Sequence, residues 1–395
     1  MNKLTIGFFI DTFYPMVDGV VMVVDNYARR LCKDYNVIVF CPKPVKGNFN
    51  DSVFPYKVVR CNSLPVPFID YNLPLPKVDL DFSNELNKYK LDIVHIHSPA
   101  TLGKMGIRYA KKHNSLLIGT LHSQYKQDIK RALKFDGVSS IITRGIVNTF
   151  NKCDEVWTVN NSIARLFKEE YGYKRDVRIM QNASSIEPIK DVDGARCRIN
   201  ELSKIDDSYK VLLFVGRLNK LKNIFFIIDS LVELDKLNPK YKYKMIFVGS
   251  GQDEDDLKKY IFKNNLNDKV ILTGKITDRE LLAMYYRRAD LFLFPSWYDA
   301  NSLVQIEAAS QETPTLFIEK TATSYYVDDN INGFLAENTA TGYAKRIDEV
   351  LSNDKLLKEV SHNALRDIYK SWDDIVSEVS KLYIELLEKK VRDKK

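Results

Sequence analysis

The chain has 395 residues, 45% of them apolar, which is long enough for two domains that each bury a core. Its five cysteines are widely separated and include no Cys-x-x-Cys pair, so neither a disulfide scaffold nor a zinc site is indicated. Residues 101–150 hold nine Lys or Arg against two Asp, which equals the whole net charge of +7. This charge fits either a solvated helix face or a surface for anionic lipid, and nucleic acid is not expected because no binding module accompanies it.

The N-terminal segment predicts a buried strand over Leu4–Ile10, a loop, and an apolar helix over Val20–Leu31. The loop lacks the Gly-x-Gly-x-x-Gly pattern, which disfavours a dinucleotide-binding oxidoreductase. Gly19 lets the backbone approach a phosphate closely, whereas Asp18 adds a negative charge beside it.

Strands and amphipathic helices then alternate, which predicts a parallel sheet covered on both faces. The further strands are expected at Tyr35–Cys41, Lys57–Arg60, Leu91–His97, Leu116–Leu121, Glu155–Val159 and Asp176–Met180, with helices at Leu102–His113 and Ser162–Glu170. The proline-rich stretch Asn62–Pro76 is expected to be a loop, with exposed apolar side chains that either pack or touch an acyl chain.

Three of the four histidines in this half lie in or directly after predicted strands. His95 and His97 are expected to face opposite sides of their strand and to have separate structural roles. His122 follows the strand Leu116–Leu121, at the carboxyl edge where ligands bind in parallel sheets. His122 is therefore the histidine predicted to contact substrate.

Residues 183–208 are polar and are expected to link the domains, and a second strand–helix series begins at Tyr209–Val215. Arg217 and Lys222 follow this strand, and a guanidinium and an ammonium suit two phosphates. The acidic cluster Asp253–Asp256 falls in a first helical turn, where the helix dipole explains it better than a metal.

The stretch 290–310 predicts a strand over Leu291–Phe294, a loop, and a helix with Ser302 as its N-cap and Leu303 in its first turn. Such a helix start offers backbone N–H groups to an anion. Asp299 and Glu307 are expected to flank it, and carboxylates there suit neutral hydroxyls. Phosphate bound by backbone and hydroxyls bound by carboxylates together indicate a nucleotide sugar.

Four segments carry a family resemblance: Asp11-Thr-Phe-Tyr-Pro, Thr120-Leu-His, Gly216-Arg-Leu with Lys222, and the acid-x7-Glu pair Asp299 and Glu307. In this order they resemble the group-1 retaining GT-B glycosyltransferases over essentially the whole chain. The chain departs from the family pattern with Asp299 in place of Glu, Asn301-Ser302-Leu303 in place of Phe-Gly-Leu, and Ala183 after Asn182.

The resemblance implies an α/β fold with two Rossmann-like doubly wound parallel-sheet domains facing a cleft. The boundaries are an acceptor-side domain 1–182, a linker 183–208, a nucleotide-sugar domain 209–370, and a C-terminal helix 371–395 that crosses back to the first domain. It implies hexose transfer with retention by front-face attack, without metal or cofactor, from a nucleotide-sugar substrate that is UDP-linked. The implied sites are catalytic (His122, Asp299) and donor-binding (Gly19, Arg217, Lys222, Ser302, Leu303, Glu307).

The N-terminal half is also similar to bacterial enzymes that glucosylate diacylglycerol, in Asp11-Thr-Phe-Tyr-Pro, Pro65-Val-Pro-Phe68, Thr120-Leu-His-Ser-Gln-Tyr125 and the basic region after it. A membrane glycolipid or surface-glycan acceptor follows as an expectation. Because no apolar run approaches a signal peptide core or a membrane span, a cytoplasmic protein, peripheral on the inner face of the membrane, is expected. The alternative from another class is a non-catalytic GT-B subunit that scaffolds or regulates a partner transferase.

Overall fold

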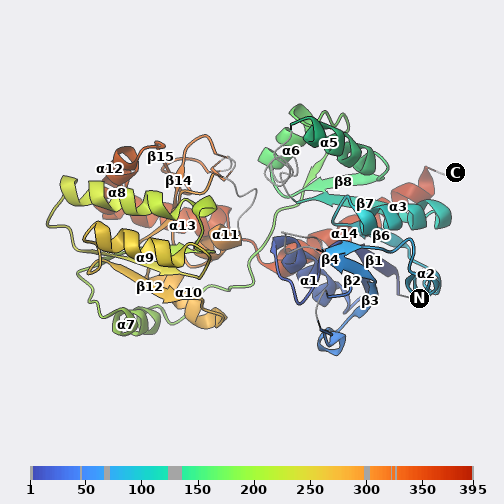
Figure 1. The fold of residues 1–395 in the computed structure, drawn as a ribbon, viewed down its shortest axis with the longest axis horizontal. Coiled ribbons are helices and arrows are strands. Elements are labelled where there is room, and N and C mark those ends of the chain that lie inside the picture. Colours follow the sequence, from blue (N-terminus) through green and yellow to red (C-terminus); the bar gives the residue numbers. More distant parts are fainter. Residues whose placement is uncertain are drawn as a thin grey trace. The chain divides into compact units, whose positions relative to one another are not determined.

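A computed structural model of the chain divides into two compact units, Met1–Asn182 with Trp372–Lys395, and Ala183–Ser371 (Figure 1). The structure describes residues 3–44, 47–65, 72–122, 136–297, 303–321, 323–324 and 327–393.

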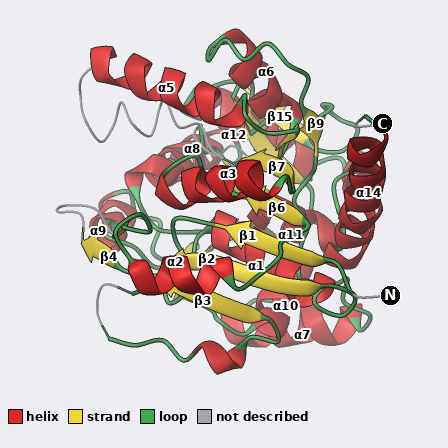
Figure 2. Cartoon of the chain, turned by 90° about the vertical axis from the view of Figure 1, so that its right-hand side faces the viewer, coloured by secondary structure: helices red, strands yellow, loops and turns green. Residues whose placement is uncertain are grey.

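The first unit is built on a seven-stranded parallel sheet in the order β3-β2-β1-β6-β7-β8-β9 (Figure 2). Its strands are β1 (Thr5–Phe9), β2 (Asn36–Pro42), β3 (Lys57–Cys61), β6 (Ile93–Ile96), β7 (Leu116–Leu121), β8 (Glu155–Thr158) and β9 (Arg178–Ile179). The central strands are buried on both faces, as their continuous apolar sequence requires.

Helices connect the strands of this sheet. They are α1 (Gly19–Leu31), α2 (Leu80–Asn87), α3 (Thr101–His113), α5 (Asp136–Phe150), α6 (Asn161–Glu169) and a short 3-10 turn η1 (Asp51–Val53). The final helix α14 (Trp372–Arg392) also belongs to this unit and packs against α1 and β7. Tyr35 and Ser380 share a hydrogen bond of 2.6 Å, and Lys390 forms an ion pair of 2.6 Å with Asp154, so polar contacts fix the middle and the C-terminal end of α14.

The proline-rich stretch predicted as a loop contains a small antiparallel hairpin of β4 (Ser63–Pro65) and β5 (Asn72–Pro74). Leu64 and Leu73 are cross-strand partners in it, and both are about half exposed. Prolines are tolerated here because the hairpin is separate from the parallel sheet. Val66, Phe68 and Ile69, expected to be exposed, lie outside the described residues.

The second unit has a six-stranded parallel sheet in the order β12-β11-β10-β13-β14-β15. Its strands are β10 (Lys210–Val215), β11 (Tyr243–Val248), β12 (Val270–Gly274), β13 (Leu291–Phe294), β14 (Thr315–Ile318) and β15 (Phe334–Ala336). Its helices are α7 (Val192–Ser203), η2 (Lys220–Lys222), α8 (Ile224–Leu237), α9 (Glu254–Lys263), α10 (Arg279–Arg288), α11 (Leu303–Ser310), α12 (Ala340–Leu351) and α13 (Asp354–Asp367).

The segment 183–208, expected to be a linker, is folded into the second unit. Helix α7 forms within it and packs against α10. Asp191 caps this helix by accepting a hydrogen bond of 2.9 Å from the backbone of Gly194. The polar composition therefore reflects a solvent-facing helix and its caps.

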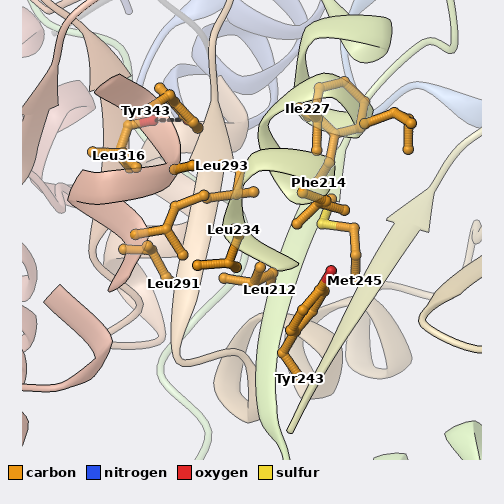
Figure 3. Packing of buried hydrophobic residues seen from close by; sticks show 14 of the residues in the cluster. Leu212, Phe214, Ile227, Leu234, Tyr243, Met245, Leu291, Leu293, Leu316 and Tyr343 are labelled. Carbon is orange, nitrogen blue, oxygen red and sulfur yellow. Dashed lines mark hydrogen bonds between the residues drawn. The ribbon is translucent and has the colours of Figure 1, made fainter. Parts of the chain in front are cut away.

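Alternating side chains of the second sheet enter two cores, one on each face. Leu291 and Leu293 belong to the core formed with α8 and α12, part of which Figure 3 shows. Phe292 and Phe294 belong to the core on the opposite face, with α10. The hydroxyl of buried Tyr343 donates to the carbonyl oxygen of Leu316 at 2.8 Å, which ties α12 to the sheet. Apolar side chains fill both faces, so the polar edge at the strand ends is where a ligand can be bound.

All five cysteines carry free thiols. In the described parts of the chain, no helix combines the length and the apolar character that a bilayer crossing requires.

Candidate active site

Two loops interlock at the carboxyl edge of the second sheet. The loop after β10 begins at Gly216, and the loop after β11 contains Gly249 and Gly251. A Cβ atom on Gly249 would lie 1.9 Å from the carbonyl oxygen of Gly216, and one on Gly251 would lie 2.2 Å from that of Leu218. The glycines are therefore needed for this close approach, which fixes the backbone that carries Arg217 and Lys222.

Side chains hold the Arg217–Lys222 loop further. Asn219 accepts a hydrogen bond from the backbone N–H of Lys222 at 3.2 Å, and Asp253 accepts one from that of Lys220 at 2.8 Å. Arg217 itself is exposed. The loop is thus rigid at its backbone and presents the Arg217 guanidinium at the surface, which is the arrangement a diphosphate site needs.

Lys222 lies next to the segment that follows β13. Its Nζ is 5.9 Å from the centre of the Phe294 ring, and Asn223 donates to the carbonyl oxygen of Pro295 at 3.3 Å. From the other side, Thr323 donates to the carbonyl oxygen of Ser296 at 3.0 Å. The structure therefore brings the predicted phosphate-binding loop and the start of the predicted sugar-binding loop together.

Of the residues predicted in this second loop, Leu303 is the first residue of α11. Asp299 and Ser302 lie outside the described residues, so their predicted roles remain predictions.

Glu307 lies on α11 and is 5% exposed. Its Oε1 accepts from Arg279 Nη1 at 3.1 Å, and its Oε2 accepts from the Tyr286 hydroxyl at 3.1 Å. Burial raises the pKa of Glu307, although Arg279 and Tyr286 counteract the rise. Each carboxylate oxygen can accept a further hydrogen bond, so this geometry is compatible with binding of two neighbouring hydroxyls.

The acidic residues after Gly251 have contacts and positions within the protein itself. Within the described ranges, no group of three or more His, Cys, Asp or Glu side chains is placed to hold a metal ion. Asp253 instead anchors the predicted phosphate-binding loop, and Glu254, Asp255 and Asp256 lie in the first turn of α9.

In the first unit, Asp18 is the N-cap of α1. Its Oδ1 accepts hydrogen bonds of 2.9 Å from the backbone N–H groups of Val20 and Val21. The Asp18 carboxylate, which the sequence analysis treated only as a negative charge near a phosphate, therefore satisfies two free backbone N–H groups at the start of α1. A Cβ atom on Gly19 would meet nothing within 4 Å, so the protein itself does not require glycine there. A role of Gly19 toward a phosphate remains a prediction.

Asp11 connects the loops that follow β1 and β6. Its carboxylate accepts from the hydroxyls of Ser98 at 2.5 Å and Thr101 at 2.8 Å, and from the backbone N–H of Leu102 at 2.9 Å. Asp11 thus caps α3 from a distant part of the chain.

The prediction that His95 and His97 face opposite sides is wrong. Side chains two residues apart in a strand share a face, and the two ring centres are 4.2 Å apart. Across the sheet, His95 Nε2 lies 2.7 Å from Thr120 Oγ1, and His97 Nδ1 lies 2.9 Å from His122 Nε2. The three histidines form one cluster, which we call the histidine cluster.

The histidine cluster is buried and uncharged. His122, directly after β7 as predicted, is 8% exposed, and burial lowers its pKa to about 3. Burial also lowers the pKa of His95 and of His97 well below the usual value, with a smaller effect from the neighbouring histidines. The hydroxyl of Tyr383 on α14 lies 2.6 Å from His95 Nδ1, so the C-terminal helix reaches the cluster.

Sequence reasoning missed Arg279, Tyr286 and Tyr383, assigned His97 to the wrong face, and gave Thr120 no contact with a histidine. The correct strand period would have grouped His95 with His97, and Thr120 with His122. Arg279, Tyr286 and Tyr383 gave no such signal, because their contacts join elements far apart in the sequence.

Two family models match the chain in succession. Residues 17–187 match the model described as Glycosyltransferase Family 4, and residues 198–367 match the model described as Glycosyl transferases group 1. These ranges contain most of the candidate site residues of both units.

Two similar proteins are named alpha-monoglucosyldiacylglycerol synthase. The one from Acholeplasma laidlawii is 25% identical over 379 residues, which cover 91% of this chain and 92% of that protein. The one from Streptococcus pneumoniae is 26% identical over 321 residues, which cover 79% of this chain and 70% of that protein. Both names describe synthesis of a glycolipid.

Solved structures share the fold. Sucrose-phosphate synthase from Thermosynechococcus elongatus superimposes with a TM-score of 0.76 at 20% identity, covering 98% of this chain and 100% of that chain. Anabaena HepE in complex with UDP-glucose superimposes with a TM-score of 0.73 at 15% identity, covering 97% and 100%. With two parallel-sheet units and both family models matched in order, the chain belongs to the group 1 glycosyltransferases and has their GT-B fold.

Proposed function

We propose that this glycosyltransferase moves a hexose from a UDP-linked donor to a membrane glycolipid or diacylglycerol acceptor, with retention of anomeric configuration and without a metal ion. The observation that carries the donor part is the rigid loop that presents Arg217 and Lys222 beside the segment after β13. Relatives named as glycolipid synthases support the acceptor part and do not favour a non-catalytic subunit.

In the proposed reaction, the bond between the sugar C1 and the diphosphate oxygen breaks while a bond from C1 to the acceptor oxygen forms on the same face. The acceptor hydroxyl gives its proton to the leaving diphosphate, so no separate base and no covalent intermediate are required. Negative charge grows on the diphosphate, where Arg217, Lys222, Leu303 at the start of α11 and the preceding residue in the sequence, Ser302, stabilise it.

The other predicted residues act on hydroxyl groups. Glu307, already ionically paired with Arg279, accepts from the ribose hydroxyls, and Asp299 accepts from the sugar. His122 contacts the transferred sugar from the acceptor-side unit, and Gly19 lets backbone approach the donor.

Incubation with a panel of UDP-, GDP- and ADP-linked hexoses tests the donor assignment. The expected outcome is slow hydrolysis of a UDP-hexose, which is measured as the release of UDP. Hydrolysis restricted to a donor with another base would overturn the UDP assignment while leaving hexose transfer intact.

His122→Ala should lower turnover by about 100-fold and change donor affinity by less than about 3-fold, because its proposed contact is with the reacting sugar and not with the diphosphate. Steady-state kinetics with the identified acceptor and UDP titration measure the two effects. His113→Gln, on an exposed position of α3, is the matched control. Wild-type turnover in His122→Ala would remove this histidine from the reaction.

A basic surface supports the lipid acceptor. Helix α3 exposes Lys104, Arg108, Lys111 and Lys112 at helical spacing, while Leu102 and Ile107 of the same helix are buried. We call these four residues the α3 basic stripe. The other basic residues of this region on which lipid binding was predicted, Lys126, Lys130, Arg131 and Lys134, lie outside the described residues.

Wild-type protein should therefore sediment with vesicles that contain anionic lipid, and sedimentation should weaken with salt because exposed charges are screened over about 8 Å at physiological ionic strength. Two quadruple variants test this binding. One replaces the α3 basic stripe with glutamine, and the other replaces the four basic residues between 126 and 134 with glutamine. Each should weaken vesicle binding by up to roughly 4 kcal/mol. A matched control replaces four exposed lysines of the second unit: Lys240, Lys242, Lys259 and Lys263. If wild-type protein stays in the supernatant at low salt, a soluble or polysaccharide acceptor replaces the lipid.

A further inference from the structure

One buried ring nitrogen of the histidine cluster lacks a hydrogen-bond partner among the described residues. His97 is fully buried, and its Nδ1 lies 2.9 Å from His122 Nε2. Its other ring nitrogen, Nε2, is buried and has no hydrogen-bond partner in the structure as described. The ring is enclosed by apolar and aromatic neighbours, with the Phe8 ring centre at 5.4 Å and that of Tyr27 at 6.2 Å.

This orphan nitrogen decides where the protons are. A neutral imidazole has one N–H donor and one lone-pair acceptor. With the proton on Nε2, His97 would bury an N–H group without an acceptor, and such orphaned donors are rare in proteins. With the proton on Nδ1, the orphan is only an unused lone pair, and the N–H lies on the nitrogen that faces His122.

The tautomer of His97 determines the tautomer of His122, which lies directly after the neighbouring strand β7. When His97 Nδ1 donates, His122 must accept at Nε2, so the lone pair of Nε2 is occupied. Because burial keeps His122 neutral, its single proton must then be on Nδ1.

We propose that His97 is a positioning residue that fixes His122 as its Nδ1–H tautomer, so that His122 acts as a neutral hydrogen-bond donor to an oxygen of the substrate. In this role it serves neither as a general base nor as a cation. The donor role rests on the proposed contact of His122 with the sugar, whereas the tautomer rests only on the geometry of the cluster.

The tautomer accounts for the chemistry of a site that needs no base. In front-face transfer the acceptor proton goes to the leaving diphosphate, so a histidine near the sugar is useful only as an oriented donor. A neutral donor also avoids placing a positive charge next to the cationic sugar that develops as the C1 bond breaks.

NMR of protein labelled with ¹⁵N in histidine tests the tautomer without any substrate. The chain has five histidines, and the His122 and His97 signals are assigned by their loss in His122→Gln and His97→Asn. We expect a protonated, pyrrole-type Nδ1 and an unprotonated, pyridine-type Nε2 for His122 at neutral pH. A proton on His122 Nε2, or on both nitrogens, would overturn the proposal.

Three variants of one position test the consequence. The amide of His97→Asn places an N–H near the position of Nδ1 and should keep kcat within about 5-fold. His97→Leu has similar bulk but no donor. It should lower kcat by about 10-fold, because the loss of one neutral hydrogen bond reduces the fraction of His122 in the Nδ1–H tautomer by about that factor. An ionised His97→Asp offers only acceptors, so it should draw a proton onto His122 Nε2 and lower kcat most, with donor KM within about 3-fold for all three.

The two proposals fail differently. If the NMR signals show the Nδ1–H tautomer but His122→Ala keeps full turnover, the catalytic role of His122 is wrong and the tautomer stands. If His97→Leu folds with wild-type thermal stability and keeps both the wild-type tautomer and kcat, His97 does not position His122.

Discussion

Lys222→Ala and Arg217→Ala should each weaken UDP binding by about 10- to 100-fold without unfolding the protein. A charge-assisted hydrogen bond to a phosphate contributes about 1.5–3 kcal/mol, and 1.4 kcal/mol corresponds to a factor of ten in affinity. Asn219 and Asp253 hold the backbone of the loop by hydrogen bonds. Truncating the side chain of Arg217 or Lys222 therefore leaves the loop in place. Isothermal titration with UDP measures the effect directly.

Lys220→Ala is the matched control, because Lys220 belongs to the same loop and is exposed, but its Nζ lies 3.9 Å from the Asp253 carboxylate. We expect its UDP affinity to stay within about 3-fold of wild type. Equal losses of UDP affinity in all three variants would indicate a general electrostatic attraction. Wild-type affinity in both Arg217→Ala and Lys222→Ala would show that this loop does not bind the diphosphate.

Acid should destabilise the first unit strongly. All three histidines of the cluster have a lowered pKa in the folded protein, to about 3 for His122. Below about pH 6.5 the unfolded chain binds protons that the folded cluster does not, so the free energy of unfolding falls as the pH decreases. From pH 7 to pH 5 His122 should cost about 2 kcal/mol of stability, and His95 and His97 should add to this loss in the same direction.

Urea unfolding followed by tryptophan fluorescence measures this loss. Trp157 and Trp372 are buried in the first unit, whereas Trp297 of the second unit is 55% exposed, so Trp297→Phe isolates the signal of the first unit. His122→Gln should reduce the loss between pH 7 and pH 5 by about 2 kcal/mol. A free energy of unfolding that is the same at both pH values would contradict a buried neutral cluster.

Much of the fold follows from the sequence because parallel strands and their helices have local signatures. The runs Leu4–Ile10, Leu116–Leu121 and Leu291–Phe294 are apolar enough to specify buried strands, and the structure has β1, β7 and β13 there. The antiparallel pairing of β4 with β5 was not predicted, since proline-rich sequence favours loops and the hairpin is stabilised away from the main sheet.

The candidate site was less predictable, because its geometry depends on contacts between distant segments. The partners of Glu307 come from α10, and the partner of His95 on α14 is separated from it by most of the chain. The capping role of Asp18 was not predicted, because an acidic residue before a helix looks the same in the sequence whether or not it caps that helix. His97 was misplaced by an error of strand periodicity, not by a lack of information in the sequence.

The most direct test of the proposed function is transfer of labelled hexose from a UDP-hexose to diacylglycerol or glycolipid in vesicles that contain anionic lipid, with the product analysed by NMR at its anomeric proton. The account predicts that an α-linked donor gives an α-linked glycolipid together with an equal amount of UDP, in the presence of a metal chelator. A β-linked product would contradict retention, and the absence of both glycolipid formation and donor hydrolysis with every UDP-hexose would contradict the proposed function itself.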